Sequence, residues 1–459
     1  MKRINYLIDG HQRISTLFGA LHTEERSLLD REYDDTRWPL YYELDAKDRP
    51  AFRVPPRRGS VPEHWLPLDI LLDGDRLFDF TQRLRQKGRR DLAREAESLA
   101  NIFRDYIIPI IPLVTESLDT VTDAFVRINS QGKGMSEAHM LRALTHLHAI
   151  DTERHFDKVR VRLESLGWAG LDDQVLINIL KLLLGLDVYA AGVREIREVL
   201  ERNAWPIDFL PDVVEEAVRV LAGIGVRSPS ALPYSYQLVT LAALAARFGG
   251  RLSAPHYRDC LERWFWVTTY TEYFTGITGT RIREGIEALT HELNNGSAPL
   301  ATNAAPIKPL AEFRVPAVRT RAFLLFLAQL PRDAEARRRR QERLGMDDPR
   351  TTPSLFSNAS RWDPANRVIA DLAELRTLRT VVKSVQQLQG APHPLFELAE
   401  SLGTSIEKLE AQADEFGIPL EALEDFPDED AFLDTRRRWL FGQERAFIRQ
   451  FGLEMLDQA

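Results

Sequence analysis

The sequence has few of the residues that mark several common classes of protein. It contains one cysteine, Cys260, in 459 residues, so an internal disulfide framework and a cysteine-rich zinc site are excluded. Its ten histidines show no pair at convincing metal-ligand spacing, and we expect no metal site built on them. No apolar run reaches membrane-spanning length, and the amino terminus lacks the apolar core of a signal peptide. We expect a cytoplasmic protein without a membrane partner.

Charge and composition narrow the class further. Acidic residues number 68 and Lys plus Arg 60, which gives a formal net charge of −8. This balance argues against a protein that coats nucleic acid over its whole surface, although a local basic face is compatible with it. Hydrophobic residues at 44% and charged residues at 28% are typical of a globular chain. The length predicts two or three domains.

One stretch near the amino terminus, NYLIDGHQRISTLFGAL over residues 5–21, has an unusual order of elements. It predicts a short apolar strand at residues 6–8, a tight turn at Asp9 and Gly10, and then an amphipathic helix. Free backbone N–H groups and the helix dipole at such a junction favour an anion such as a phosphate. Arg13 lies in the first turn of the helix, where a cation opposes the dipole. An anion held between Arg13 and these N–H groups would offset that cost.

The rest of the first 150 residues predicts a mixed domain with few strands. Residues 38–52 read as a hairpin, the expected partner of the first strand. WLPLDILLDG at residues 65–74 predicts a short helix or turn, and residues 78–104 one or two amphipathic helices. DYIIPIIPLVT at residues 105–115 is β-branched and predicts a strand that ends near a sheet edge.

A second unusual stretch is DAFVRINSQGKGMSEAHMLRAL at residues 123–144. It predicts a helix to Ile128, a glycine-bearing loop, and a new helix capped by Ser136. Beyond residue 146 helical periodicity is almost continuous, without a fixed repeat. We therefore expect a helical bundle at residues 149–296, a linker at 297–320 and a helical carboxyl-terminal domain at 321–459.

Together the two stretches resemble one family. DGHQRISTL is similar to the DGQQR motif of the GmrSD-type restriction proteins, whose amino-terminal domain has the ParB/sulfiredoxin fold. FVRINSQGKGMS is similar to that family's second signature, an F-x-R-I-N segment followed by a glycine and a serine. The order and separation of the motifs also fit, and GIPLEALEDF with EDAFLDTRRRWL is similar to the family's closing helices. The implied fold class is α+β, predominantly α, with residues 1–148 as the ParB-like domain and a helical insert at about 78–104.

The resemblance implies that the first domain binds a nucleoside triphosphate, often with hydrolysis, in bacterial defence against modified or invading DNA. Asp9, Gly10, Gln12 and Arg13 match the first motif, while His11 replaces its usual glutamine and Ser15 its common threonine. In the second motif the matching residues are Phe125, Arg127, Asn129, Gly132 and Ser136.

Each of these residues also has an ordinary structural reading. Asp9 can cap the helix, hold Mg²⁺ or hold a water, and Gln12 can orient an attacking water or face solvent. Arg13 can clamp phosphate oxygens or pair with a nearby glutamate such as Glu24 or Glu25. In the second motif, Arg127 and Asn129 can complete the anion site. Alternatively, Arg127 pairs with Asp123 at helical spacing, and Asn129 ends a helix.

The chain departs from the family pattern in two places. Family members have a strand and helices before the DGQQR strand, so we expect a truncated amino-terminal domain: either the start codon is mis-assigned or the pocket is incomplete. Many members also carry a His-Asn-His nuclease, and here the corresponding region is PSLFSNASRWDPANRVIAD at residues 353–371. Asn366 is the candidate match for the family's later Asn. The region contains no histidine to serve as general base, so we do not expect DNA cleavage by that route.

Two further patterns favour packing over function. The arginine runs 337–340 and 436–438 can contact DNA phosphates, but both lie near acidic residues on amphipathic helices, which favours a solvated face. Trp264, Phe265 and Trp266 can stack on a base, but their density within a helical bundle favours core packing. The alternative to a nucleotide-hydrolysing protein is a non-catalytic DNA-binding or scaffold subunit of a defence system, and the missing amino-terminal segment and the missing nuclease histidine favour it.

Overall fold

The chain divides into two compact units, residues 1–134 and 135–459. The computed structural model describes residues 10–21, 40–47, 51–55, 60–110, 112–115, 120–121, 124, 136–146, 151–295, 305–315, 317–344, 349–388, 394–424 and 428–457. The described structure is predominantly helical, with one small antiparallel sheet, in agreement with an α+β chain that is mostly α. None of the described helices combines the length and apolar character that a membrane span requires.

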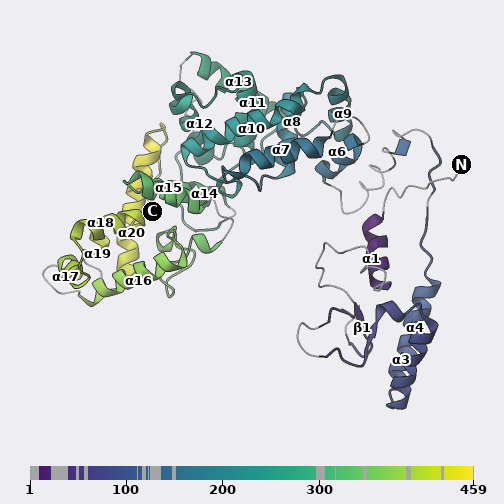
Figure 1. Ribbon diagram of the computed structural model, residues 1–459. Helices are drawn as coiled ribbons and strands as arrows, with labels where there is room; N and C mark the ends of the chain where they lie inside the picture. The colour runs from purple at the N-terminus through teal and green to yellow at the C-terminus, as the bar shows by residue number, and fades with distance from the viewer. Residues whose placement is uncertain are drawn as a thin grey trace. The chain divides into compact units, whose positions relative to one another are not determined.

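The first unit is built from a helix, a three-stranded sheet and a helical pair (Figure 1). Its elements are α1 (His11–Leu21), β1 (Tyr41–Glu43), β2 (Phe52–Arg53), β3 (Trp65–Pro67), the 3₁₀ turn η1 (Leu68–Ile70), α3 (Gly74–Gln86) and α4 (Arg90–Asp105). The sheet order is β2-β1-β3, and both pairs are antiparallel. One core joins all these parts except β2, and it includes Ala20 of α1, Tyr42 of β1, Leu66 of β3, Leu77 of α3 and Ala93 of α4.

Sequence periodicity predicts part of this unit correctly. The hairpin expected at residues 38–52 is confirmed as β1 and β2, and the insert at 78–104 forms the two antiparallel-packed helices α3 and α4. Residues 65–67, expected to lie in a helix or turn, instead form β3 before the turn η1. The three residues pair with β1, a long-range contact that local propensity does not encode.

The strand expected at residues 105–115 is wrong for the part that the structure describes. Residues 106–110 and 112–115 carry no strand, and their apolar side chains are largely exposed, up to 96% at Val114. Pro109 and Pro112 each lack the N–H that a sheet requires, which weakens pairing along this run.

The second unit is a run of packed helices. They are α6 (Glu137–His146), α7 (Thr152–Glu164), α8 (Asp173–Leu183), α9 (Val193–Arg202), α10 (Trp205–Ile224), α11 (Ser235–Arg247), α12 (Arg258–Tyr270), α13 (Gly279–Asn295), α14 (Val318–Leu327), α15 (Ala334–Leu344), α16 (Leu372–Gln387), α17 (Pro394–Ser401), α18 (Ile406–Glu415), α19 (Glu421–Glu424) and α20 (Glu429–Arg449). Short 3₁₀ turns lie at 229–231, 255–257, 349–351 and 364–366.

The unit boundary differs from the expected one at residue 148. Helix α6 packs on α7, α8 and α9, so it belongs to the second unit. The expected division at 297–320 does not separate compact units either. Ile307 pairs with Met455, its N–H donating to Glu454 O at 2.8 Å, and α14 packs on both α12 and α20. These contacts join the carboxyl-terminal helices to the bundle.

Candidate functional site

The turn into α1 is the described part of the first motif. Gly10 has a φ of +91°, a left-handed conformation that favours glycine, and α1 begins at the next residue. The Ile14 N–H donates to Gly10 O at 2.9 Å, which closes the first helical turn. The N–H groups of residues 11–13 precede that bond, at the end of the helix where the dipole is positive. The turn therefore has the local geometry expected of an anion cradle.

Arg13 folds back over this turn. A Cβ added at Gly10 would lie 3.7 Å from Arg13 Nη2, so the guanidinium lies beside the glycine rather than far out in solvent. Arg13 is also an exposed residue, as are Gln12 and Ser15 on the same helix. The cation expected to offset an anion is thus positioned at the helix end where the anion would lie.

The other predicted site residues are described only in part. Asp9 of the first motif and Arg127, Asn129 and Gly132 of the second lie outside the described residues. His11 is the first residue of α1. Ser136 is exposed, and its carbonyl accepts from Met140 N–H at 3.1 Å where α6 begins. The expectation that the two motifs meet in one pocket stays a prediction.

The helix that follows the second motif is firmly held in the bundle. Glu137 of α6 lies 2.7 Å from the ammonium of Lys181, which is 2% exposed on α8. Arg142 of α6 donates to Asp173 at 2.6 Å, also on α8. A buried ammonium requires such a partner, so the carboxyl-terminal edge of the second motif is joined to a rigid element.

Glu43, Asp45 and His64 form a cluster that the sequence analysis did not connect. Their candidate ligand atoms lie within 4.8 Å of one another, because β1, the turn after it and the residue before β3 are brought together by the sheet. Arg53 donates to Glu43 Oε2 at 2.8 Å, and His64 Nε2 lies 3.3 Å from Asp45 Oδ1. Arg89 Nη2 lies 4.0 Å from Asp45 Oδ2, so an arginine of the protein already lies beside each carboxylate, and we assign no metal to them.

The first arginine run is used within the fold. Arg340 is 2% exposed and contacts Glu374 and Glu415 at 3.0 Å each. Arg338 pairs with Glu342 at 2.8 Å, one helical turn away, and Arg337 donates to Pro331 O at 3.1 Å. Arg337 and Arg338 are thus paired within the fold, but the burial of Arg340 differs from the solvated face expected of this run, because its guanidinium pairs with Glu374 and Glu415 inside the fold.

The second arginine run is used in the same way. Arg436 is fully buried and donates to four backbone carbonyls, those of Ala365, Arg367, Phe416 and Gly417. Burial lowers the pKa of Arg436 to about 10, so it remains a cation at neutral pH. Its charge is solvated by carbonyl dipoles inside the protein, where it cannot contact DNA.

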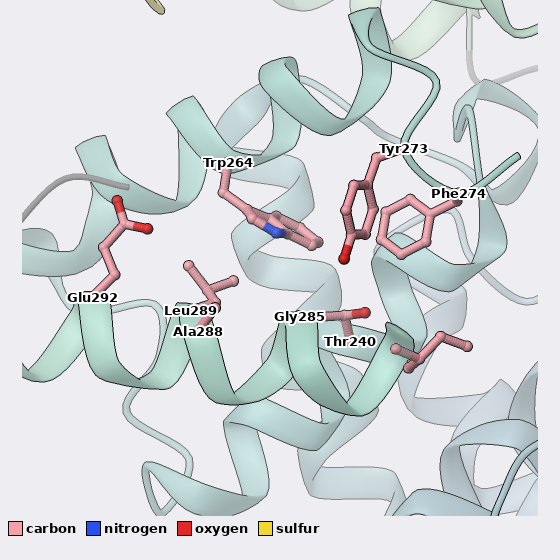
Figure 2. A pocket seen from close by; sticks show the side chains of 9 residues that line it. Thr240, Trp264, Tyr273, Phe274, Gly285, Ala288, Leu289 and Glu292 are labelled. Carbon is pink, nitrogen blue, oxygen red and sulfur yellow. The ribbon is translucent and has the colours of Figure 1, made fainter. Parts of the chain in front are cut away.

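The aromatic cluster is core packing, as its density indicated. Trp264, Phe265 and Trp266 of α12 are at most 4% exposed. Figure 2 shows Trp264 with Tyr273 and Phe274 above the helix that carries Gly285 and Glu292. The cavity among them has a volume of about 20 Å³, which is room for about one water and not for a nucleotide base.

Cys260 lies near the same helix and is a poor nucleophile. Burial and the adjacent Glu292 carboxylate raise the pKa of its thiol to about 12. A thiol must ionise before it attacks an electrophile. Covalent catalysis through this cysteine at neutral pH is therefore not supported.

The region that resembles the nuclease is held together by Asn366. This side chain is fully buried; its amide donates to Phe356 O at 3.0 Å and Ser360 O at 3.2 Å, and its carbonyl accepts from Phe356 N–H at 2.8 Å. The bonds use both ends of the amide to fix the loop at residues 355–366. Asn366 therefore has a structural role here and does not face an open site.

Comparisons of this chain with protein-family models, with curated proteins and with solved structures give no match. The resemblance to the GmrSD-type proteins accordingly rests on the two sequence motifs.

Proposed function

We propose that the first unit is a ParB/sulfiredoxin-like domain that binds a nucleoside triphosphate at the turn into α1. The observation that supports this most is the combination of Gly10 in a left-handed conformation, a helix that starts at His11, and the Arg13 guanidinium beside that glycine. Backbone N–H groups and a guanidinium are complementary to phosphate oxygens in both charge and geometry.

In this proposal each motif residue has a defined role. Gly10 permits close approach of a phosphate, and Arg13 clamps its oxygens. Asp9 would hold Mg²⁺, which would neutralise phosphate charge, and Gln12 would orient the attacking water. His11 and Ser15, the two positions where the chain departs from the family motif, contact the nucleotide. The roles that the resemblance implies for Arg127, Asn129, Gly132 and Ser136 of the second motif stay predictions.

The biological setting of the proposal is bacterial defence of the restriction type. The helical second unit would sense DNA or a partner defence protein, and the nucleotide state of the first unit would control that contact. We do not propose that the chain cleaves DNA by the His-Asn-His route, because residues 353–371 contain no histidine to act as general base and the Asn366 side chain is bonded within its loop.

A thermal-shift screen tests nucleotide binding directly. ATP, GTP, CTP and UTP are each added to the full chain with and without Mg²⁺. A ligand that binds only the folded state raises the melting temperature. The proposal predicts an upward shift with at least one triphosphate that grows when Mg²⁺ is present. Identical melting curves in all eight conditions would contradict it.

The second candidate, a non-catalytic scaffold, is favoured by the use of polar residues in the carboxyl-terminal helices. Arg340, Asn366 and Arg436 all serve packing there. A chain that binds no nucleotide but retains a DNA or protein partner in a pull-down with purified components would support this reading. Release of inorganic phosphate from a triphosphate by the purified chain, lost on Gln12→Ala, would exclude it.

A further inference from the structure

The carboxyl-terminal helices line a cavity, open to the surface on one side, that the nucleotide proposal does not use. It lies among α16, α17, α18 and α19, which Figure 1 draws beside the yellow helix α20, and its volume is about 340 Å³. Protein interiors pack as densely as organic crystals and leave few voids larger than a water. A space of this size is in the range of sites that bind small molecules.

The walls of the cavity are mainly apolar. They include Leu378 and Val381 of α16, Leu398 of α17, Leu409 of α18, and Phe416, which directly follows α18. Of these, Leu378, Leu398 and Leu409 are also part of the buried core of this region. The helices leave apolar surface uncovered on these walls, and a ligand that covers it gains hydrophobic free energy.

One end of the cavity is polar and electrically balanced. Arg340 is 2% exposed, its Nη1 donates to Ile369 O at 2.6 Å and to Glu374 at 3.0 Å, and Nη2 lies 3.0 Å from Glu415. All three of these charged side chains line the cavity. Arg339 also contacts Glu415 at 3.1 Å, and Arg343 contacts Glu374 at 3.2 Å. Two carboxylates are therefore already matched by three guanidinium groups.

The guanidinium of Arg340 has two buried nitrogens, Nε and Nη2, that make no hydrogen bond among the described residues, although Nη2 lies 3.0 Å from Glu415. The centre of the Phe416 ring lies 4.3 Å from the guanidinium carbon. A buried donor without an acceptor costs free energy, so a ligand that supplies an oxygen there gains what water cannot provide. A charged acceptor is disfavoured, because Glu374 and Glu415 already stand beside the cation.

We propose that this cavity binds a small, uncharged, mainly aliphatic molecule that carries a carbonyl or amide oxygen. The aliphatic body covers the apolar walls, and the oxygen accepts from Arg340 at the polar end. This site lies wholly within the second unit, so the proposal is independent of the nucleotide site and stands or falls separately.

Three eight-carbon probes distinguish recognition of the head group from nonspecific hydrophobic binding. Octanamide, octanoate and octylamine share one chain and differ in the head group. Binding to the full chain is measured by saturation-transfer NMR and by titration calorimetry. We expect octanamide to bind at least tenfold more tightly than either charged probe. Failure of octanamide to bind, or equal affinity for all three probes, would overturn the proposal.

Variants place the binding site. Val381→Trp and Thr377→Trp each add a large side chain to the lining, and Thr377 is exposed at the mouth, so its variant is the milder change. Lys383→Trp on the same helix is exposed, does not line the cavity, and is the matched control. Circular dichroism confirms that each variant is folded. We expect a tenfold or greater loss of octanamide affinity in both lining variants and none in the control. Unchanged affinity in a folded Thr377→Trp chain would overturn the assignment.

Discussion

Arg319 forms a bidentate ion pair with Glu444, in which Nη1 and Nη2 each donate to a different carboxylate oxygen at 2.8 Å. The pair joins α14 to α20, and Tyr270 of α12 donates to the same carboxylate at 2.9 Å. Both side chains are largely buried, at 13% and 4% exposure. The ion pair joins two carboxyl-terminal helices, and the Tyr270 hydroxyl joins α20 to α12 of the bundle, in agreement with a second unit that does not divide at residues 297–320.

Removing one partner of this pair should be costly. Glu444→Ala would leave a buried guanidinium without its carboxylate, and we expect the free energy of unfolding to fall by about 3–5 kcal/mol. The double variant Arg319→Met with Glu444→Leu removes both charges and should lose much less. Urea denaturation followed by circular dichroism measures both. A double variant as unstable as Glu444→Ala would show that the ion pair is not what holds α20.

Asn366 offers a second stability test, in the region that resembles the nuclease. Asn366→Ala removes the partners of Phe356 N–H, Phe356 O and Ser360 O. Each buried polar group left without a partner costs about 1–3 kcal/mol. We expect clear destabilisation of the second unit with no effect on nucleotide binding by the first. A nucleotide-binding defect without any loss of stability would instead assign Asn366 to a functional site.

Asp187 gives a pH dependence with a defined sign. Its pKa is lowered by the N–H groups of Ala190 and Tyr189, and Arg283 at 3.3 Å adds to the effect. A depressed carboxyl pKa contributes stability that is present above the unfolded value, about 3.9 for Asp, and is lost as pH falls through the folded value. We expect Asp187→Asn to be less stable than the parent at pH 7. The difference should shrink as pH falls below about 4, in thermal melts recorded across that range.

Cys260 should report its raised pKa by slow chemistry. A thiol with a pKa of about 12 is almost wholly protonated at pH 8, so its reaction with an aromatic disulfide reagent should be far slower in the native chain than in 8 M urea, the denaturing condition of the assay. Absorbance of the released thiolate measures the rate. Equal rates in the two conditions would mean that the thiol is exposed and normally acidic.

The sequence predicts the regular parts of this fold well, because helical periodicity is a local signal. The long amphipathic runs of the second unit and the pair α3 and α4 lie where the apolar spacing indicates. Strands depend on partners distant in sequence, and both errors fall there: residues 65–67 pair with β1 as β3, whereas residues 106–110 and 112–115, for all their β-branched side chains, form no strand.

The sequence also does not show which side chains of a charged run are buried. The adjacent arginines of 436–438 look alike in sequence, yet Arg436 is fully buried against four carbonyls, while Arg437 pairs with Asp363 at 2.7 Å. Arg436 lies between η5, the turn at residues 364–366, and residues 416–417 after α18, whereas Arg437 pairs with the residue before η5, a difference set by tertiary packing. The cluster of Glu43, Asp45 and His64 is likewise a product of sheet pairing, with no spacing that would have marked it beforehand.

The most direct test of the central claim is titration calorimetry of the full chain with the non-hydrolysable analogue of whichever triphosphate gives the largest thermal shift, in the presence of Mg²⁺. Arg13→Ala removes the guanidinium beside Gly10, and Arg104→Ala removes an exposed arginine of α4 as the matched control. A charge-assisted contact to phosphate contributes about 1.5–3 kcal/mol. The account therefore predicts a dissociation constant at least tenfold higher for Arg13→Ala and an unchanged one for Arg104→Ala. Equal affinity of the parent and Arg13→Ala would contradict it.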